Sequence, residues 1–272
     1  MSSPNHGNTQ LLSGKIAVIY GAGGATGRVI AHTFAREGAK VFLTGRNLAK
    51  VELVTKKIVA DGGAAEAAQV DALDENAVDS HLRAIVDKVG QIDISFNAIG
   101  IPQQGIQGIP LTELSVDSFS LPIATYAQAH FVTARAAGRH MVRQRTGVIL
   151  MHTPEPARLG APLVGGMGPA WASMEGLSRS LSAELASFGV RSVCLRTTGL
   201  PETETIDVVF GLHAKAHGIT REQFQSLTEG TTHRRRSTTL LELANVAAFV
   251  ASDRAAAITG TVVNLTGGAI VD

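Results

Sequence analysis

Short apolar runs alternate with longer amphipathic stretches along almost the whole chain. A short apolar run bounded by glycine or polar residues is typical of a buried strand, and the longer stretches are typical of helices. Strands are predicted at 15–20, 40–44, 66–70, 92–96, 147–151, 190–195 and 261–265. Helices are predicted at 25–37, 48–61, 74–89, 118–144, 168–187 and 239–252.

The regular alternation of strand and helix predicts one fold class. Because crossover helices connect parallel strands, the pattern favours a doubly wound α/β fold with a Rossmann-like parallel sheet of about seven strands. We assign residues 13–272 to a single domain and the polar residues 1–12 to a disordered N-terminal tail. Residues 200–236 interrupt the rhythm after the sixth strand. Ligands of such sheets bind at the carboxyl ends of the strands, so this insertion is predicted to be a substrate lid.

Composition and charge narrow the class of protein further. Of the 272 residues, 44% are hydrophobic and only 17% are charged, which argues against disorder. A formal net charge of +1 gives no reason to expect nucleic acid or a membrane as a partner. No signal peptide or membrane-spanning apolar run is recognisable, which predicts a soluble cytoplasmic protein. Cys194 is the only cysteine, which excludes an intramolecular disulfide and a multi-cysteine metal site, and we predict no metal.

A glycine-rich turn lies between the first predicted strand and the first predicted helix. Glycines at this place let the backbone approach a pyrophosphate, and the helix N-terminus offers oriented N–H groups with partial positive charge. The candidate cofactor-binding residues of this turn are Gly21, Gly23, Gly24, Thr26 and Gly27. An ordinary strand-to-helix turn is the alternative.

The end of the second predicted strand bears on the choice of cofactor. An acidic residue there would bind both ribose hydroxyls of NAD, whereas this chain has Thr44-Gly45-Arg46. The Arg46 cation can neutralise a 2′-phosphate, and no carboxylate stands there to repel it. The sequence therefore favours NADP(H) over NAD. A solvated surface arginine is the alternative.

Several motifs together resemble the classical short-chain dehydrogenases/reductases, from about residue 13 to the end of the chain. Residues 21–27 match the family's TGxxxGxG turn, with tyrosine before the turn and Ala25 at the middle glycine. Residues 181–186 and 258–268 match further signatures. The resemblance implies cofactor contacts from Asp71 and Ala72, and from the residues that match the family's NNAG motif, Asn97, Ala98 and Gly100. It also implies a small-molecule substrate and a homo-oligomer, either a tetramer or a dimer.

The resemblance fails at the family's catalytic positions. Residues 175–181 align without gaps to the segment after the family's Tyr-x-x-x-Lys pair. Counting back places Met167 at the tyrosine and Trp171 at the lysine. The serine position is Pro154, and the asparagine position is Tyr126. The alignment thus implies a divergent member without the Asn-Ser-Tyr-Lys tetrad, so its catalytic residues stay unassigned.

Three side chains offer a replacement acid or base. Tyr126 and His130 share one face of a predicted helix, because they stand four residues apart. His152 lies near the carboxyl end of the fifth strand and could shuttle protons. Glu155 is close to the former serine position. Packing or interface roles are the alternatives for Tyr126 and His152, and loop surface is the alternative for Glu155.

Three functions remain open at this point. The first is an NADP-dependent oxidoreductase that uses a non-standard proton donor. The second is a non-catalytic NADP(H)-binding protein, and the third is a non-redox isomerase or cyclase that uses the same pocket. The basic run at 233–236 is interpreted as a solvated face, with an anionic ligand as the alternative. Cys194 is interpreted as an inert buried thiol.

Overall fold

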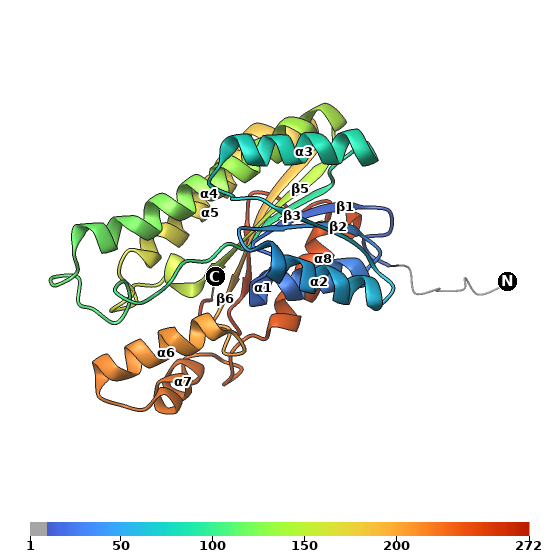
Figure 1. Ribbon diagram of the computed structural model, residues 1–272. Coiled ribbons are helices and arrows are strands. Elements are labelled where there is room, and N and C mark those ends of the chain that lie inside the picture. Colours follow the sequence, from blue (N-terminus) through green and yellow to red (C-terminus); the bar gives the residue numbers. More distant parts are fainter. Residues whose placement is uncertain (1–9, 272) are drawn as a thin grey trace.

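The computed structural model describes residues 10–271 and contains a parallel sheet with helices on both faces (Figure 1). The strands are β1 (Ile16–Tyr20), β2 (Lys40–Gly45), β3 (Ala64–Gln69), β4 (Ile94–Asn97), β5 (Gly147–Pro154), β6 (Val190–Thr197) and β7 (Val262–Leu265). The α-helices are α1 (Ala25–Arg36), α2 (Leu48–Ala60), α3 (Glu75–Val89), α4 (Val116–Gln144), α5 (Met167–Leu185), α6 (Glu204–His217), α7 (Arg221–Gly230) and α8 (Leu240–Ala251). Short 3₁₀ helices are η1 (Glu155–Ala157), η2 (Ala186–Phe188) and η3 (Asp253–Ala255).

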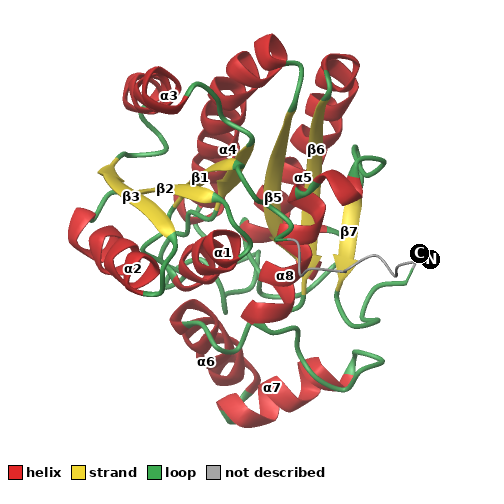
Figure 2. Cartoon of the chain, turned by 90° about the vertical axis from the view of Figure 1, so that its right-hand side faces the viewer, coloured by secondary structure: helices red, strands yellow, loops and turns green. Residues whose placement is uncertain are grey.

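The strand order is β3-β2-β1-β4-β5-β6-β7, and every neighbouring pair is parallel (Figure 2). The chain moves outward from β1 through β2 to β3, then returns to the other side of β1 with β4. The switch point therefore lies between β1 and β4, where sheets of this kind bind ligands. The predicted fold class is confirmed, with a seven-stranded sheet in a single domain.

Two hydrophobic cores lie on opposite faces of the sheet. Helices α1, α2 and α8 cover one face, and α3, α4 and α5 cover the other (Figures 1 and 2). Every residue of β1 is buried, because its alternating side chains enter both cores. This strand fixes the position of the glycine-rich turn that follows it.

Polar side chains set the start of several helices where the sequence pattern placed them. Asn47 caps α2 by accepting a hydrogen bond from the Lys50 N–H at 3.1 Å, and Asp74 caps α3. Thr239 and Glu242 form a capping box at α8. These caps satisfy N–H groups that the first helical turn leaves unpaired.

The proposed disordered tail differs from the structure at its end. Residues 1–9 lie outside the described residues. Leu12 is fully buried against the core, and the Gln10 side-chain amide donates to the Arg36 carbonyl at 2.9 Å. Residues 10–12 therefore pack against the domain. The mostly polar composition of residues 1–12 does not reveal that Leu12 is buried.

The interruption at 200–236 contains α6 and α7, which lie together at one end of the molecule (Figures 1 and 2). Phe224 of α7 packs against the Phe210 and His213 rings of α6, with centroids 5.5 Å and 5.1 Å away. His213 also hydrogen-bonds to Gln107 at 3.1 Å, in the loop after β4. This contact holds the inserted helices against the carboxyl side of the sheet.

Candidate cofactor and substrate site

A cleft of about 850 Å³ opens at the carboxyl ends of β1, β2, β3 and β4. Its volume is in the range of small-molecule and cofactor sites. Predicted cofactor residues that line it are Gly21, Gly23, Gly24, Arg46, Asp71, Ala72, Ala98 and Gly100. Sequence positions far apart are thus brought to one surface by the parallel sheet.

The glycine-rich turn is shaped by backbone contacts that exclude larger side chains. Gly21 has a φ of 71°, and a Cβ built on it would lie 2.7 Å from the Ala98 carbonyl oxygen. A Cβ on Gly27 would lie 2.5 Å from the Gly21 carbonyl oxygen. Gly24 begins α1 without a side-chain cap, and the first turn of the helix carries no acidic residue. The N–H groups of that turn are therefore available to a phosphate.

Thr26, Gly27 and Asn97 are not among the residues that line the cleft. Gly27 instead permits the close packing of α1 on the turn. The Asn97 side chain is buried and donates to the Thr133 hydroxyl at 3.0 Å, while its Oδ1 accepts from the Ile99 N–H at 3.0 Å. Asn97 thus ties β4 and the following loop to α4 from beneath the cleft.

The β2 end of the cleft carries two cations. Arg46 is exposed there, and Lys50 of α2 lines the same wall. Among the described lining residues, Asp71 is the only carboxylate, and it follows β3 rather than β2. Sequence reasoning missed Lys50, although its place in the first turn of the helix after Arg46 could have indicated it. It also missed Thr205 of α6, whose approach to the cleft has no signal in the sequence.

The positions aligned with the family's catalytic residues lie beyond this cleft. Met167 is the first residue of α5 and is buried, and Trp171 follows it by one turn and packs against a core cluster. Pro154 is the last residue of β5, where it pairs with Thr197 of β6. Tyr126 lies on α4 and is buried, with its ring 6.2 Å from the His130 ring.

Burial shifts the pKa of all three candidate replacement acids, Tyr126, His152 and Glu155, and of two other buried side chains, His130 and Tyr20. Desolvation raises the pKa of Tyr126 to about 12 and lowers the pKa of His130 to about 3 and that of His152 to about 4. The pKa of Tyr20, also fully buried, lies well above its ordinary value. Desolvation raises the pKa of Glu155 to about 7. Only Glu155 in this group therefore changes protonation near neutral pH.

A buried polar cluster lies beside these residues. Arg196 of β6 donates to both carboxylate oxygens of Glu175 of α5, at 2.8 Å and 2.7 Å. The Thr153 hydroxyl of β5 donates to Glu175 at 3.0 Å. All three side chains are buried, so each depends on the others for its hydrogen bonds. His152 is engaged as well, through a 2.8 Å contact with the Thr197 hydroxyl.

The basic run is exposed and partly neutralised. Arg234 and Arg236 both form ion pairs with Glu242, at 2.6 Å and 2.7 Å. The Arg235 side chain donates to the Gly230 carbonyl at 2.5 Å. Their exposure and these surface contacts agree with the interpretation of residues 233–236 as a solvent-exposed face. Cys194 is fully buried, and desolvation raises the pKa of its thiol to about 12, as expected for an unreactive thiol.

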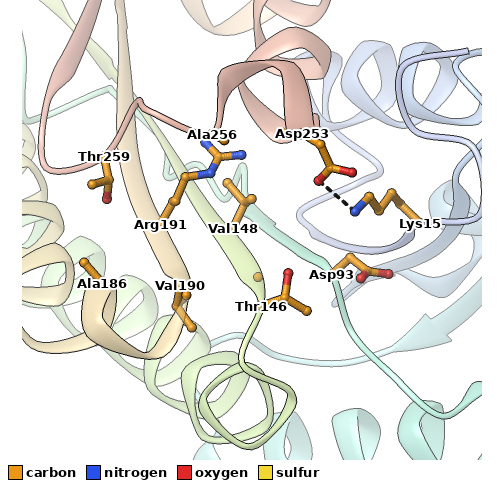
Figure 3. Close-up of a pocket in the computed structure, with 13 residues that line it drawn as sticks. Lys15, Asp93, Thr146, Val148, Ala186, Val190, Arg191, Asp253, Ala256 and Thr259 are labelled. Atoms are coloured by element: carbon orange, nitrogen blue, oxygen red, sulfur yellow. Dashed lines mark hydrogen bonds and ion pairs between the residues drawn. The ribbon is translucent and has the colours of Figure 1, made fainter.

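A second, smaller pocket of about 260 Å³ lies at the opposite ends of the strands (Figure 3). Lys15 and Asp253 form an ion pair of 3.0 Å across its rim. Arg191 donates to the Ile258 and Ser252 carbonyls, and Asp93 accepts from the Ile16 N–H. Its charged groups are therefore already paired, and the amino ends of parallel strands are not the usual ligand side.

Known proteins resemble this chain over nearly its whole length. A family model described as "Enoyl-(Acyl carrier protein) reductase" matches residues 21–269. Among curated proteins, the uncharacterized oxidoreductase YxbG of Bacillus subtilis is 31% identical over 94% of this chain and 91% of its own. The 3-oxoacyl-[acyl-carrier-protein] reductase FabG of Escherichia coli is 29% identical, over 94% and 97% of the two chains.

Among solved structures, sorbitol-6-phosphate 2-dehydrogenase SrlD of Erwinia amylovora superposes with a TM-score of 0.88. The two proteins share 25% identity, and the match covers 94% of this chain and all of that one. Within the described residues, no helix is both long and apolar enough to cross a membrane. The fold, the matched segment and the relatives agree, and the chain belongs to the short-chain dehydrogenase/reductase superfamily of oxidoreductases.

Proposed function

We propose that this protein is an NADP(H)-dependent oxidoreductase that acts on a small molecule with a proton donor other than the family's tyrosine. The observation that carries the proposal is the cleft wall at β2, where Arg46 and Lys50 stand without a carboxylate. Two cations favour the 2′-phosphate of NADP(H), whereas an acidic residue at this place would favour NAD.

The residues present fit such a cofactor. The N–H groups at the start of α1 would hold the pyrophosphate, because no side chain caps them and the first turn carries no acidic residue. Asp71 and Ala72 would meet the adenine from the end of β3. When bound, the nicotinamide supplies or accepts a hydride. The protein must then provide orientation, exclude water and move a proton.

The proton cannot come from three of the four aligned tetrad positions, Met167, Trp171 and Pro154. Met167 has no acidic proton, and Pro154 has neither a hydroxyl nor a backbone N–H. Trp171 carries no positive charge to lower the pKa of a neighbour. We infer that these positions shape an apolar pocket. Thr205 lines the cleft from α6, so we also propose that residues 200–236 act as its lid.

Calorimetric titration with NADPH and NADH tests the cofactor, and we expect tighter binding of NADPH. Arg46→Glu should weaken NADPH binding by about ten- to a hundredfold, since a hydrogen bond to a charged group contributes about 1.5–3 kcal/mol. Lys56→Glu is the control, because Lys56 is exposed on the same helix as Lys50 but does not line the cleft. Equal affinity for the two nucleotides would contradict the NADP preference.

Oxidation of NADPH across a panel of carbonyl, enone and imine compounds tests the chemistry. Turnover with any of them supports an oxidoreductase. Tight NADPH binding without turnover would favour the non-catalytic nucleotide-binding protein instead. Activity that is independent of added nucleotide would favour a non-redox isomerase or cyclase.

A further inference from the structure

Glu155 occupies a distinctive place at the carboxyl side of the sheet. It follows Pro154, the last residue of β5, and is the first residue of η1. The η1 turn packs against the start of α5, since a Cβ built on Gly168 would lie 3.4 Å from the Pro156 carbonyl oxygen. Glu155 thus directly follows Pro154, the position of the family's serine, on a turn that packs near Met167, the position of its tyrosine.

The Glu155 carboxyl group differs from the other buried carboxyl group nearby. Its Oε2 atom is buried and has no hydrogen-bond partner. Glu175, by contrast, accepts hydrogen bonds from Arg196 and Thr153. Buried polar atoms are usually paired, so an unpaired carboxyl oxygen needs a specific explanation. A ligand oxygen would supply the missing partner.

Burial, rather than a neighbouring charge, sets the protonation of the Glu155 carboxyl group. The first two turns of α5, residues 167–174, contain no titratable side chain. Glu175 and Arg196 neutralise each other, and Arg179 lies one turn further along α5. The exposed Arg158 closes the same 3₁₀ turn. Burial is the main cause of the raised pKa of Glu155, and a backbone hydrogen bond at Glu155 opposes it.

The competing side chains are less suited to donate a proton. His152 is already engaged with Thr197, and His130 is fully buried on α4. Both stay neutral down to acidic pH because burial lowers their pKa values. Tyr126 holds its proton too tightly, since burial raises the pKa of its hydroxyl to about 12.

From this placement we infer that Glu155 is the general acid that protonates the carbonyl oxygen of the substrate, an inference that rests on the proposed function. Glu155 gives its carboxyl proton to that oxygen as a hydride from the reduced nicotinamide nucleotide adds to the carbonyl carbon. A C–H and an O–H bond form on the substrate, while its C=O π bond, a C–H bond of the reduced nicotinamide and the carboxyl O–H bond break, so the nucleotide is oxidised. The carboxylate then takes a proton from water. In the reverse direction the carboxylate accepts the alcohol proton.

Two readouts test the inference. The first is carbon-13 NMR of protein labelled at the glutamate carboxyl groups, with the Glu155 resonance assigned from Glu155→Gln and Glu155→Asp. We expect this resonance to titrate near pH 7 in the protein without nucleotide or substrate. Titration near the ordinary value of about 4.3 would overturn the inference while leaving the proposed function intact.

The second readout is the pH profile of NADPH-dependent reduction. Reduction needs the protonated acid, so wild-type kcat should fall as pH rises through neutrality. Glu155→Gln should lower kcat by about a hundredfold or more and remove this limb, with NADPH affinity unchanged. Glu113→Gln, the same change in an exposed loop, is the control. A Glu155→Gln enzyme with wild-type kcat and pH profile overturns the inference alone, whereas an inactive wild type removes the proposed function and the inference with it.

Discussion

The two ends of the site differ in what their polar groups contact. At the proposed cofactor end, backbone N–H groups of the α1 turn and the exposed side chains of Arg46 and Lys50 face an open cleft. At the other end, around β5 and the start of α5, Thr153, Glu175 and Arg196 satisfy one another inside the protein. Groups of the first kind are available to a ligand, and groups of the second kind hold strands and helices in register.

Met167 and Trp171 pack against the hydrophobic core that α4 and α5 form on the sheet, so their side chains add apolar burial there. The buried cluster around Glu175 then fixes the position of β5 without any help from a ligand. Glu155 and His130 are exceptions, because the Oε2 atom of Glu155 and the Nδ1 atom of His130 have no hydrogen-bond partner in the protein.

The largest effect we expect comes from breaking the buried cluster. Glu175→Ala leaves the Arg196 charge buried without a partner and should lower the free energy of unfolding by about 3–5 kcal/mol. Urea denaturation measures this loss. Glu184→Ala is the control, since Glu184 is exposed on the same helix. A loss below about 1 kcal/mol would show that water reaches the cluster and that the two ends of the site are less different than their contacts indicate.

An intermediate effect should follow from filling the glycine-rich turn at the cofactor end. Gly21→Ala adds a Cβ at 2.7 Å from the Ala98 carbonyl oxygen, in a backbone conformation with φ of 71°. We expect stability to fall by about 2–3 kcal/mol and NADPH affinity to fall at least about tenfold. Calorimetry with NADPH and thermal unfolding measure the two losses separately.

Gly62→Ala is the matched control for that change. Gly62 has a φ of 84° but no atom within 4 Å of a built Cβ, so it carries the backbone strain without the collision. It should cost about 1 kcal/mol and leave NADPH affinity unchanged. Equal effects of the two substitutions on affinity would mean that the turn does not hold the nucleotide.

Much of the fold follows from the sequence because apolar runs mark buried strands plainly. The predicted ends of β5 and β6 were too early, however. His152, Thr153 and Arg196 break the apolar pattern, yet they continue the parallel ladder up to Pro154 and Thr197. Polar residues at strand ends can stay in the sheet when they find partners across it, and a local pattern does not show those partners.

The candidate site was predictable to the extent that it is local. The glycine-rich turn and Arg46 sit within short motifs, whereas the pairing of Glu175 with Arg196 joins residues on different elements. The unpaired oxygen of Glu155 depends on the packing of η1 against α5, which no spacing reveals. The approach of α6 to the cleft through Thr205 is likewise a tertiary feature.

The smallest effect we expect concerns stability in acid. It should arise in the inserted helices and not at the cleft, because none of the described residues that line the cleft is a histidine. Burial lowers the pKa of His213 to about 4 in the folded state, against about 6.5 when unfolded. The unfolded chain therefore binds a proton first, and stability is lost as pH falls from about 6.5 towards 4. We expect His213 to account for about 1–2 kcal/mol of that loss.

Replacing His213 tests this assignment, since His213→Asn removes the titrating group while an amide can still donate to Gln107. Urea denaturation at pH 7 and pH 4.5 should show a smaller difference for this variant than for the wild type. His233→Asn, an exposed change outside α6, should keep the wild-type difference. If both variants behave like the wild type, His213 takes up its proton without loosening α6, and the contact with Gln107 does not hold the inserted helices closed. The acid sensitivity would then come from other histidines whose pKa values burial also lowers, among them His81, His130 and His152.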